Sequence, residues 1–316
     1  MSVKNDQALL IKICQYYYFE GLTQSDIAKR VSLSRPTIVR MLKQAREEGL
    51  VEIRLTKPVP KTMTLETEIE KAFMDYGLKE VVVANASGLS PKEDVAKAAS
   101  DYLRRTLRPN HFLGVGWSTT LSYVASQFTP GQYTPLRIVQ LIGAAGKISG
   151  ANANEIAIKL GDTCRVLVDP MPTPAIVESV EVRDALLRDA TMLRTMKATE
   201  ACNIGLVGVG DVSDLSTMIQ ADYLTPQDLE YVAEHKGVGD ILGQYYDIDG
   251  NEVKTPWSER IMGMSLSNLK KVDNVIAVAA EASKVLAVLG ALRGGLINTL
   301  IIDIPLAEAL LEAVNS

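Results

Sequence analysis

Apolar positions in the first 57 residues recur with a helical period and predict three short helices. An apolar face over residues 8–19 ends before Gly21, and glycine commonly terminates a helix. Further helical patterns cover residues 24–31 and 35–48. Residues 50–55 alternate between apolar and polar side chains, which predicts a short strand that would form a wing beside the helices.

The rest of the chain alternates between predicted strands and predicted helices. Residues 58–63 contain two prolines and predict a stiff linker between a domain at 1–57 and a second domain at 64–316. Strand candidates occur at residues 80–84, 111–117, 137–143, 163–168, 203–208, 240–246, 275–279 and 299–303. Helical patterns lie between most of them, at residues 65–76, 91–107, 118–128, 182–201, 226–235, 283–292 and 306–314. Repeated βα units predict an α/β fold with a mostly parallel, doubly wound sheet.

Composition narrows the class of protein. Hydrophobic residues make up 47% of the 316 residues and charged residues 22%, which is typical of a soluble globular protein. No apolar run reaches the ~18 residues that span a bilayer, and the polar N-terminus does not resemble a signal peptide. We therefore expect a cytoplasmic protein without a membrane partner. Three scattered cysteines and two histidines have no metal-ligand spacing, so we expect no metal and no cofactor.

Charge is distributed unevenly between the two predicted domains. Residues 1–57 hold ten lysines and arginines against six acidic residues, whereas the remainder holds 23 basic and 32 acidic residues. This asymmetry indicates that only the N-terminal domain meets a polyanion such as DNA. A chance fluctuation in a short segment would explain the charge alone equally well.

Residues 24–43 have the spacing of a helix-turn-helix. Thr23 and Ser34 can cap the second and third helices, and Pro36 lies in the first turn of the third. Ser32 stands where a turn glycine is usual, but serine tolerates turns. The apolar residues that would hold the helices together are Ile27, Ala28, Leu33, Ile38 and Leu42.

The third helix would then present polar side chains to the major groove of DNA. Arg35 and Arg40 can bind guanine through paired hydrogen bonds, and Thr37 can touch a base edge or a thymine methyl group. Contacts to phosphates would position the domain without specifying a sequence. The predicted DNA-binding residues are Gln24, Ser25, Ser34, Arg35, Thr37, Arg40 and Lys43. The alternative is an ordinary three-helix bundle with a solvated charged face.

A glycine turn with hydroxyl side chains follows the strand predicted at residues 111–117. Free amides at the start of the next helix, together with Ser118, Thr119 and Thr120, would make a cradle for an anion such as a phosphate. A plain strand-to-helix turn capped by Ser118 explains the same residues. Neither this turn nor the glycine run at 205–211 satisfies the spacing of a dinucleotide fingerprint.

Two charged residues further along the chain are candidates for the same site. Asp240 opens a predicted strand and can present a carboxylate to sugar hydroxyls, although a turn role explains it equally well. Lys284 lies at a helix start, where the helix dipole disfavours a cation, so its position indicates a nearby anion. A solvated surface lysine is the alternative.

These motifs together resemble those of the SorC/DeoR-type sugar-binding transcriptional regulators. The resemblance runs through almost the whole chain and is carried by residues 21–28, 33–42, 114–120, 139–141, 237–241, 249–250, 284, 290–295 and 300–303. It implies an effector domain similar to sugar-phosphate isomerase folds that have lost catalysis. It also implies phosphorylated sugars as the usual effectors and a homotetramer as the usual assembly.

The resemblance assigns roles to individual residues. It implies that a phosphate is held by Gly116, Ser118, Thr119 and Thr120. It implies that Gln140 and Asp240 contact sugar hydroxyls and that Lys284 neutralises negative charge. Relatives often have a Gly-Gly pair after the strand that leads to the lysine, and here that stretch reads Ala280-Glu281-Ala282-Ser283-Lys284. A carboxylate close to the predicted cradle keeps a neutral sugar or polyol open as the effector.

The expected function is therefore regulation of a carbohydrate-utilisation operon. A sugar, sugar alcohol or sugar phosphate would control the affinity of a homo-oligomer, expected to be a tetramer, for double-stranded operator DNA. The alternative is a sugar-phosphate isomerase or deaminase with an accessory DNA-binding domain. Such an enzyme needs a positioned acid and base, and neither His111 nor His235 lies in a sugar-facing motif, so we predict no catalytic residue.

Overall fold

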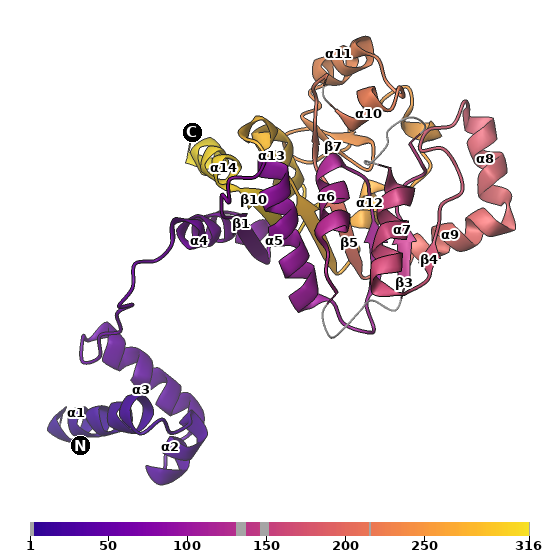
Figure 1. Cartoon of the computed structure of the whole chain (residues 1–316). Helices are drawn as coiled ribbons and strands as arrows, with labels where there is room; N and C mark the ends of the chain where they lie inside the picture. The colour runs from indigo at the N-terminus through magenta and orange to yellow at the C-terminus, as the bar shows by residue number, and fades with distance from the viewer. Residues whose placement is uncertain (1–2, 131–136, 146–151, 215, 316) are drawn as a thin grey trace. The chain divides into compact units, whose positions relative to one another are not determined.

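The computed structural model describes residues 3–130, 137–145, 152–214 and 216–315. The chain divides into two compact units, Met1–Val59 and Pro60–Ser316 (Figure 1). Each unit has its own hydrophobic core, and each is described separately below.

The N-terminal unit contains the three predicted helices. Helix α1 (Val3–Cys14) continues into one π-helical segment, η1 (Gln15–Phe19), and is followed by α2 (Gln24–Arg30) and α3 (Arg35–Glu47). The two predicted caps are confirmed: Thr23 Oγ1 accepts from Asp26 N at 3.2 Å, and Ser34 Oγ accepts from Thr37 N at 3.3 Å. Ser32 adopts the left-handed conformation, with φ +56°, which explains why glycine is usual in this turn. The helices enclose a small core of Leu10, Ile13, Tyr16, Ile27, Ala28, Ile38, Leu42 and Ala45.

The wing strand predicted at residues 50–55 is wrong. Residues 52–55 form neither helix nor strand, and the side chains of Ile53 and Leu55 are 64% and 77% exposed. Alternation creates a strand only where a partner strand supplies the ladder, and the described part of this unit offers none. Beyond it, α4 (Lys61–Phe73) begins inside the segment predicted as a linker.

The C-terminal unit is built on a parallel sheet of seven strands. In spatial order they are β1 (Glu80–Ala84), β10 (Thr299–Asp303), β9 (Asn274–Val278), β5 (Ile204–Gly208), β2 (Phe112–Val115), β3 (Arg137–Gln140) and β4 (Val168–Asp169). All their pairings are parallel. The predicted doubly wound α/β class is therefore confirmed.

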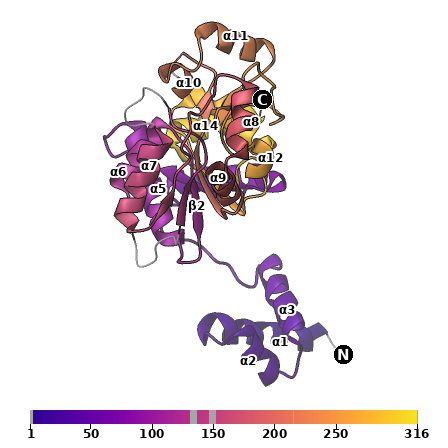
Figure 2. The same ribbon diagram turned by 90° about the vertical axis from the view of Figure 1, so that its right-hand side faces the viewer.

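Helices cover both faces of this sheet, because alternate strand residues point to opposite sides. One face packs against α5 (Pro91–Thr106), α6 (Thr119–Gln127) and α7 (Ala153–Cys164), which lie together in Figure 2. The core on the other face includes α4, α13 (Val285–Arg293) and α14 (Ile304–Asn315), and the exposed 3-10 turn η2 (Met74–Tyr76) follows α4. The remaining helices are α8 (Val180–Arg188), α9 (Ala190–Glu200), α10 (Thr217–Gln220), α11 (Pro226–Glu234) and α12 (Leu266–Leu269), with 3-10 turns at η3 (Ser258–Arg260) and η4 (Ala282–Lys284).

The direction of winding reverses at the boundary between β2 and β5. From β2 the chain adds β3 and β4 on one side, and from β5 it adds β9 and β10 on the other. In doubly wound sheets such a reversal leaves a crevice at the carboxyl ends of the two strands, which is where ligands bind. The topology alone therefore places the candidate site just beyond Val115 and Gly208.

Three predicted elements differ from the observed ones. The strand at 240–246 is a hairpin of β7 (Gly239–Ile241) and β8 (Gln244–Tyr246), because Leu242 and Gly243 both have positive φ. Most of 163–168 is not a strand, since α7 extends to Cys164 and ends in a left-handed residue. The helix predicted at 182–201 is divided into α8 and α9 by an extended residue, Asp189, whose side chain caps the second helix.

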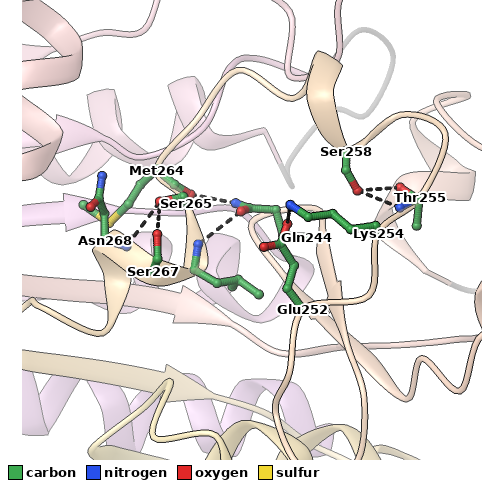
Figure 3. A network of polar contacts seen from close by, with 10 residues as sticks. Gln244, Glu252, Lys254, Thr255, Ser258, Met264, Ser265, Ser267 and Asn268 are labelled. Carbon is green, nitrogen blue, oxygen red and sulfur yellow. Dashed lines mark hydrogen bonds and ion pairs between the residues drawn. The ribbon is translucent and has the colours of Figure 1, made fainter.

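The hairpin and β6 (Gly210–Asp211) form a small antiparallel sheet that is tied to the main domain by a buried glutamine. Gln244 Nε2 donates to Met264 O at 2.7 Å, and its Oε1 accepts from Leu266 N at 3.1 Å (Figure 3). The neighbouring Ser265 caps α12 by accepting from Asn268 N at 3.2 Å. These contacts hold Asp240, in the same hairpin, against the carboxyl edge of the main sheet.

The outer edge of β1 is covered by carboxylates from α4. Glu70 Oε1 accepts from Val81 N at 2.9 Å, and Glu66 Oε1 accepts from Val83 N at 2.9 Å. These two amides point away from β10 and would otherwise be unpaired donors at the end of the sheet. Unpaired edge strands attract other strands, so the two carboxylates protect this edge.

We predict that a Glu66→Ala, Glu70→Ala double variant is less stable than the wild type by about 1 kcal/mol for each lost hydrogen bond. It should also self-associate more readily through the uncovered edge. Denaturant unfolding and light scattering measure the two effects. Glu68→Ala, an exposed change on the same helix, is the matched control, and equal unfolding midpoints for the two variants would refute the protective role.

Candidate functional site

A polar cavity of about 190 Å³ opens at the point where the winding reverses. Its walls come from the β2–α6 turn, the end of β5 with β6, α10, the β7 strand, and η4 before α13. Most of the side chains that line it are hydroxyl-bearing or charged. The site thus forms from segments that lie far apart in the sequence.

The β2–α6 turn contributes hydroxyl groups and helix amides. Ser118 caps α6, with its Oγ accepting from Leu121 N at 2.9 Å, and Thr119 and Thr120 form the first turn. Amides in a first helical turn have no carbonyl partner within the helix, so they are available to an oxygen atom of a ligand. A Cβ atom at Gly208 would lie 2.5 Å from Ser118 Cβ, so glycine lets β5 approach the turn this closely.

Asp240 places a carboxylate in this wall with only 6% of the residue exposed. Its Oδ2 accepts from Gly243 N at 3.0 Å. A Cβ atom at Gly210 would lie 2.0 Å from Oδ1, so β6 can lie beside this carboxylate only with glycine there. Burial raises the pKa of Asp240 to about 6, and the Gly243 amide and the Lys284 charge oppose that shift.

Lys284 supplies a positive charge that acts on that carboxylate group. Its Nζ donates to Val209 O at 2.7 Å and lies 3.9 Å from Asp211 Oδ1. Burial lowers the pKa of Lys284, while Asp211 and Asp240 raise it. The side chain is therefore inserted into a charged cluster at the cavity and is not a solvated surface lysine.

The structure does not place Gln140 or Gly116 in the cavity wall. The Gln140 side chain is buried, with Nε2 donating to Ile142 O at 2.7 Å and Oε1 accepting from Met171 N at 3.1 Å. Its amide thus connects backbone segments, and the side chain predicted to contact a sugar hydroxyl is not presented to the cavity. At Gly116 a Cβ atom would lie 2.8 Å from Leu242 Cδ2, so that glycine serves close packing behind the turn.

Several residues of the cavity were missed from the sequence. Lys92 comes from the start of α5, and Ser216 and Thr217 come from α10 and its cap, whereas Glu281, which precedes η4, was expected close to the cradle. Lys92 Nζ lies 3.8 Å from Glu281 Oε1. Asp211 was visible as the end of a glycine run, but no sequence signal joins Lys92 or α10 to this edge of the sheet.

The predicted DNA-binding residues lie on α2, on α3 and at the cap of α3 in the N-terminal unit. Arg35, Arg40 and Lys43 are exposed on α3, Ser25 is exposed on α2, and Gln24 and Thr37 are half-buried. Lys43 Nζ lies 3.6 Å from Glu47 Oε1, whereas Arg35 and Arg40 have no ion pair among the residues described. Ser34 Oγ lies 2.7 Å from Thr37 Oγ1 and is occupied in capping α3.

Neither histidine is among the residues that line the cavity. His111 Nδ1 accepts from Arg108 N at 3.1 Å, and the ring of His235 stacks on that of Tyr231 with centroids 3.9 Å apart. Within the described ranges no group of three metal-binding side chains occurs. No described helix is both long and apolar enough to cross a bilayer.

Comparison with known proteins decides the family. Residues 58–312 match the family model Sugar-bind, described as "Putative sugar-binding domain". The chain belongs to the SorC/DeoR family of sugar-binding transcriptional regulators.

Curated relatives align with this regulator along nearly its whole length. The deoxyribonucleoside regulator of Bacillus subtilis (strain 168) is 28% identical, over 98% of this chain and 99% of the relative. The transcriptional regulator LsrR of Enterobacter sp. (strain 638) is 30% identical, over 97% and 93%. The solved structure of the full-length sorbitol operon regulator SorC from Klebsiella pneumoniae has a TM-score of 0.73 at 25% identity, covering 97% of this chain and 99% of that one. The chain is accordingly a sugar-responsive transcriptional regulator, and the enzyme alternative is set aside.

The raised pKa of Asp240 predicts a pH-dependent stability. The folded protein holds this proton more tightly than the unfolded chain, so the free energy of unfolding falls as pH rises from about 4 to about 6. At about 1.4 kcal/mol per pKa unit, the loss approaches ~3 kcal/mol. Asp240→Asn should remove this component, whereas Asp273→Asn, an exposed change, should keep it. Denaturant unfolding at pH 4, 5, 6 and 7 tests the difference, and parallel profiles for wild type and Asp240→Asn would contradict it.

Proposed function

We propose that this regulator reads operator DNA with α3 and that a sugar, sugar alcohol or sugar phosphate in the cavity controls its operator affinity. The observation that carries the proposal is the hydroxyl-lined cavity with buried charges at the winding reversal of a sugar-binding family member. The exposed cationic face of α3 supports the DNA-binding half. Relatives named for sorbitol, erythritol and deoxyribonucleosides support a role in carbohydrate use.

Recognition of bases falls to the first half of α3. Arg35 and Arg40 extend from an exposed helical face, and without ion-pair partners among the described residues their guanidinium groups are available to guanine. Thr37 lies between them in sequence and can touch a thymine methyl group. Gln24, Ser25 and Lys43 are the candidates for phosphate contacts, and Ser34 fixes the start of α3 through its cap.

Recognition of the effector falls to the β2–α6 turn and the charged wall opposite. The hydroxyls of Ser118, Thr119 and Thr120 and the first-turn amides can bind ligand oxygens. Asp240 is suited to accept from a ligand hydroxyl, and Lys284 compensates the carboxylates around it. An effector that binds one conformation of the regulator more tightly than another would change the fraction of molecules able to bind DNA.

The working assembly is proposed to be a homo-oligomer, with a tetramer as the expected state. Helix-turn-helix proteins bind two half-sites about one helical turn apart, which requires two recognition helices related by symmetry. One helix-turn-helix unit buries too little surface to bind DNA with high specificity by itself. The named relatives are bacterial proteins, whose operators lie in the cytoplasm, and we place this regulator there too.

Arg40→Ala should weaken operator binding by about 1–3 kcal/mol and relax sequence preference at one base position, because a bidentate base contact is lost. Lys43→Ala should weaken binding to all sequences alike and lower the salt dependence, because a phosphate contact is lost. Fluorescence anisotropy with operator and scrambled DNA at several salt concentrations separates the two effects. Lys71→Ala, on α4 of the other unit, is the control, and unchanged operator affinity of Arg40→Ala would refute the assignment.

A panel of sugars, polyols and their phosphates should contain compounds that raise the melting temperature, because a ligand of the folded state stabilises it. Thr119→Val should weaken the best compound about fivefold to tenfold through the loss of one hydrogen bond. Thr67→Val removes a helical hydroxyl remote from the cavity and should leave the affinity unchanged. Equal affinities of the two variants would exclude the Thr119 hydroxyl from the binding site.

A further inference from the structure

We propose that the effector is an uncharged sugar or sugar alcohol, and that Glu281 is the residue that excludes its phosphorylated form. The inference rests on the proposed function, because it assigns the ligand class of the same cavity. Three observations lead to it: the backbone at Glu281, the pairing of both lysines, and a carboxylate oxygen at the cavity that has no donor among the described residues.

Glu281 occupies a backbone conformation that side-chain-bearing residues rarely adopt. Its φ is +80° and its ψ is 133°, a region used almost only by glycine. The conformation is held by Glu281 N donating to Asp303 Oδ2 at 3.1 Å and Glu281 O accepting from Lys284 N at 3.1 Å. Strain of this kind persists where surrounding structure enforces it and clusters at ligand sites. Here it brings a carboxylate into the cavity wall.

The charges of the cavity do not favour an added dianion. Three carboxylates line it, those of Asp211, Asp240 and Glu281, against two ammonium groups. Lys284 is engaged by Val209 O and Asp211, and Lys92 lies 3.8 Å from Glu281 Oε1. No arginine occurs among the described lining residues. A phosphate monoester carries between one and two negative charges near pH 7, so it would meet repulsion and find both lysines already paired.

Hydrogen-bonding groups of the cavity wall that have no protein partner can bind the hydroxyl groups of a ligand. Asp240 is nearly buried, and only its Oδ2 has a donor among the described residues, the Gly243 amide. Its Oδ1 has no donor among the described residues, so it can accept from a ligand hydroxyl in the cavity. A sugar hydroxyl donates and accepts, whereas a phosphate dianion only accepts. The amides of Thr119 and Thr120 are equally well satisfied by hydroxyl oxygens, so an uncharged polyol fits both walls of the cavity.

The test uses matched pairs of neutral and phosphorylated probes with the full chain. Isothermal titration would compare D-sorbitol with sorbitol 6-phosphate, erythritol with erythritol 4-phosphate, and D-ribose with ribose 5-phosphate, and would add inorganic phosphate alone. Glu281→Gly removes the carboxylate and relieves the backbone, Glu281→Gln removes the charge at constant size, and Glu281→Asp keeps the charge. Glu230→Gln, an exposed change on α11, is the control.

For whichever pair binds, the wild type should prefer the neutral member by about tenfold or more, as expected for repulsion by one partly shielded charge. Glu281→Gly and Glu281→Gln should gain about tenfold for the phosphorylated member and for inorganic phosphate, with little change for the neutral member. Glu281→Asp should retain the preference for the neutral member, and Glu230→Gln should behave as the wild type. A wild-type preference for the phosphorylated member, or no gain in either charge-removing variant, would overturn the proposal.

The titrations with inorganic phosphate alone test the proposal even when no sugar of the panel binds. Wild-type protein that binds inorganic phosphate as tightly as Glu281→Gly does would contradict the exclusion by Glu281, whatever the natural effector. Failure of the proposed function has a different signature. A neutral sugar that binds the cavity but leaves operator affinity unchanged would refute regulation and leave the ligand preference standing.

Discussion

Charged groups buried at the carboxyl edge of the sheet must compensate one another, and the rest of the site follows from this constraint. An ionised side chain removed from water is costly unless it is paired or hydrogen-bonded. Asp240, Asp211 and Lys284 come from three different segments and offset part of this cost, although burial still raises the pKa of Asp240 and lowers that of Lys284. The three side chains lie where β6, β7 and η4 meet and form one wall of the cavity.

Glycine at a few positions allows these segments to come so close. Gly208 and Gly210 let the end of β5 and β6 lie against Ser118 and Asp240, at distances that no Cβ atom could accept. A second close approach lies behind the site, where a Cβ atom at Gly250 would be 2.2 Å from Gly294 Cα. It sets the turn after β8 against the end of α13, the helix that begins directly after Lys284. The cavity is therefore shaped by backbone contact as much as by its polar side chains.

The two units divide the work of a regulator in physical terms. The N-terminal unit has a small core and an exposed cationic helix, so it can present side chains to a polyanion. The C-terminal unit has a large core on both faces of its sheet, so it can hold charged groups in fixed positions around a small ligand. A carboxylate in a strained backbone at Glu281 shows that this rigidity is sufficient to hold an unfavourable conformation at the site.

Local patterns in the sequence determined the elements and the family. Caps at Thr23 and Ser34, the helical period of α3 and the βα alternation depend on neighbours within a few residues, so they were predictable. The sequence also indicated Ser118, Thr119, Thr120, Asp240 and Lys284, which line the cavity.

Tertiary structure alone decided which side chains and strands pair with one another. The segment at 50–55 has no neighbouring strand to pair with, and the Gln140 side chain bonds to the backbone of Ile142, just after its own strand, and of Met171. Lys92 and Glu281 became a pair only when α5 and the end of β9 met at one edge, because side-chain pairing across the fold depends on distance in space, which a single sequence does not record.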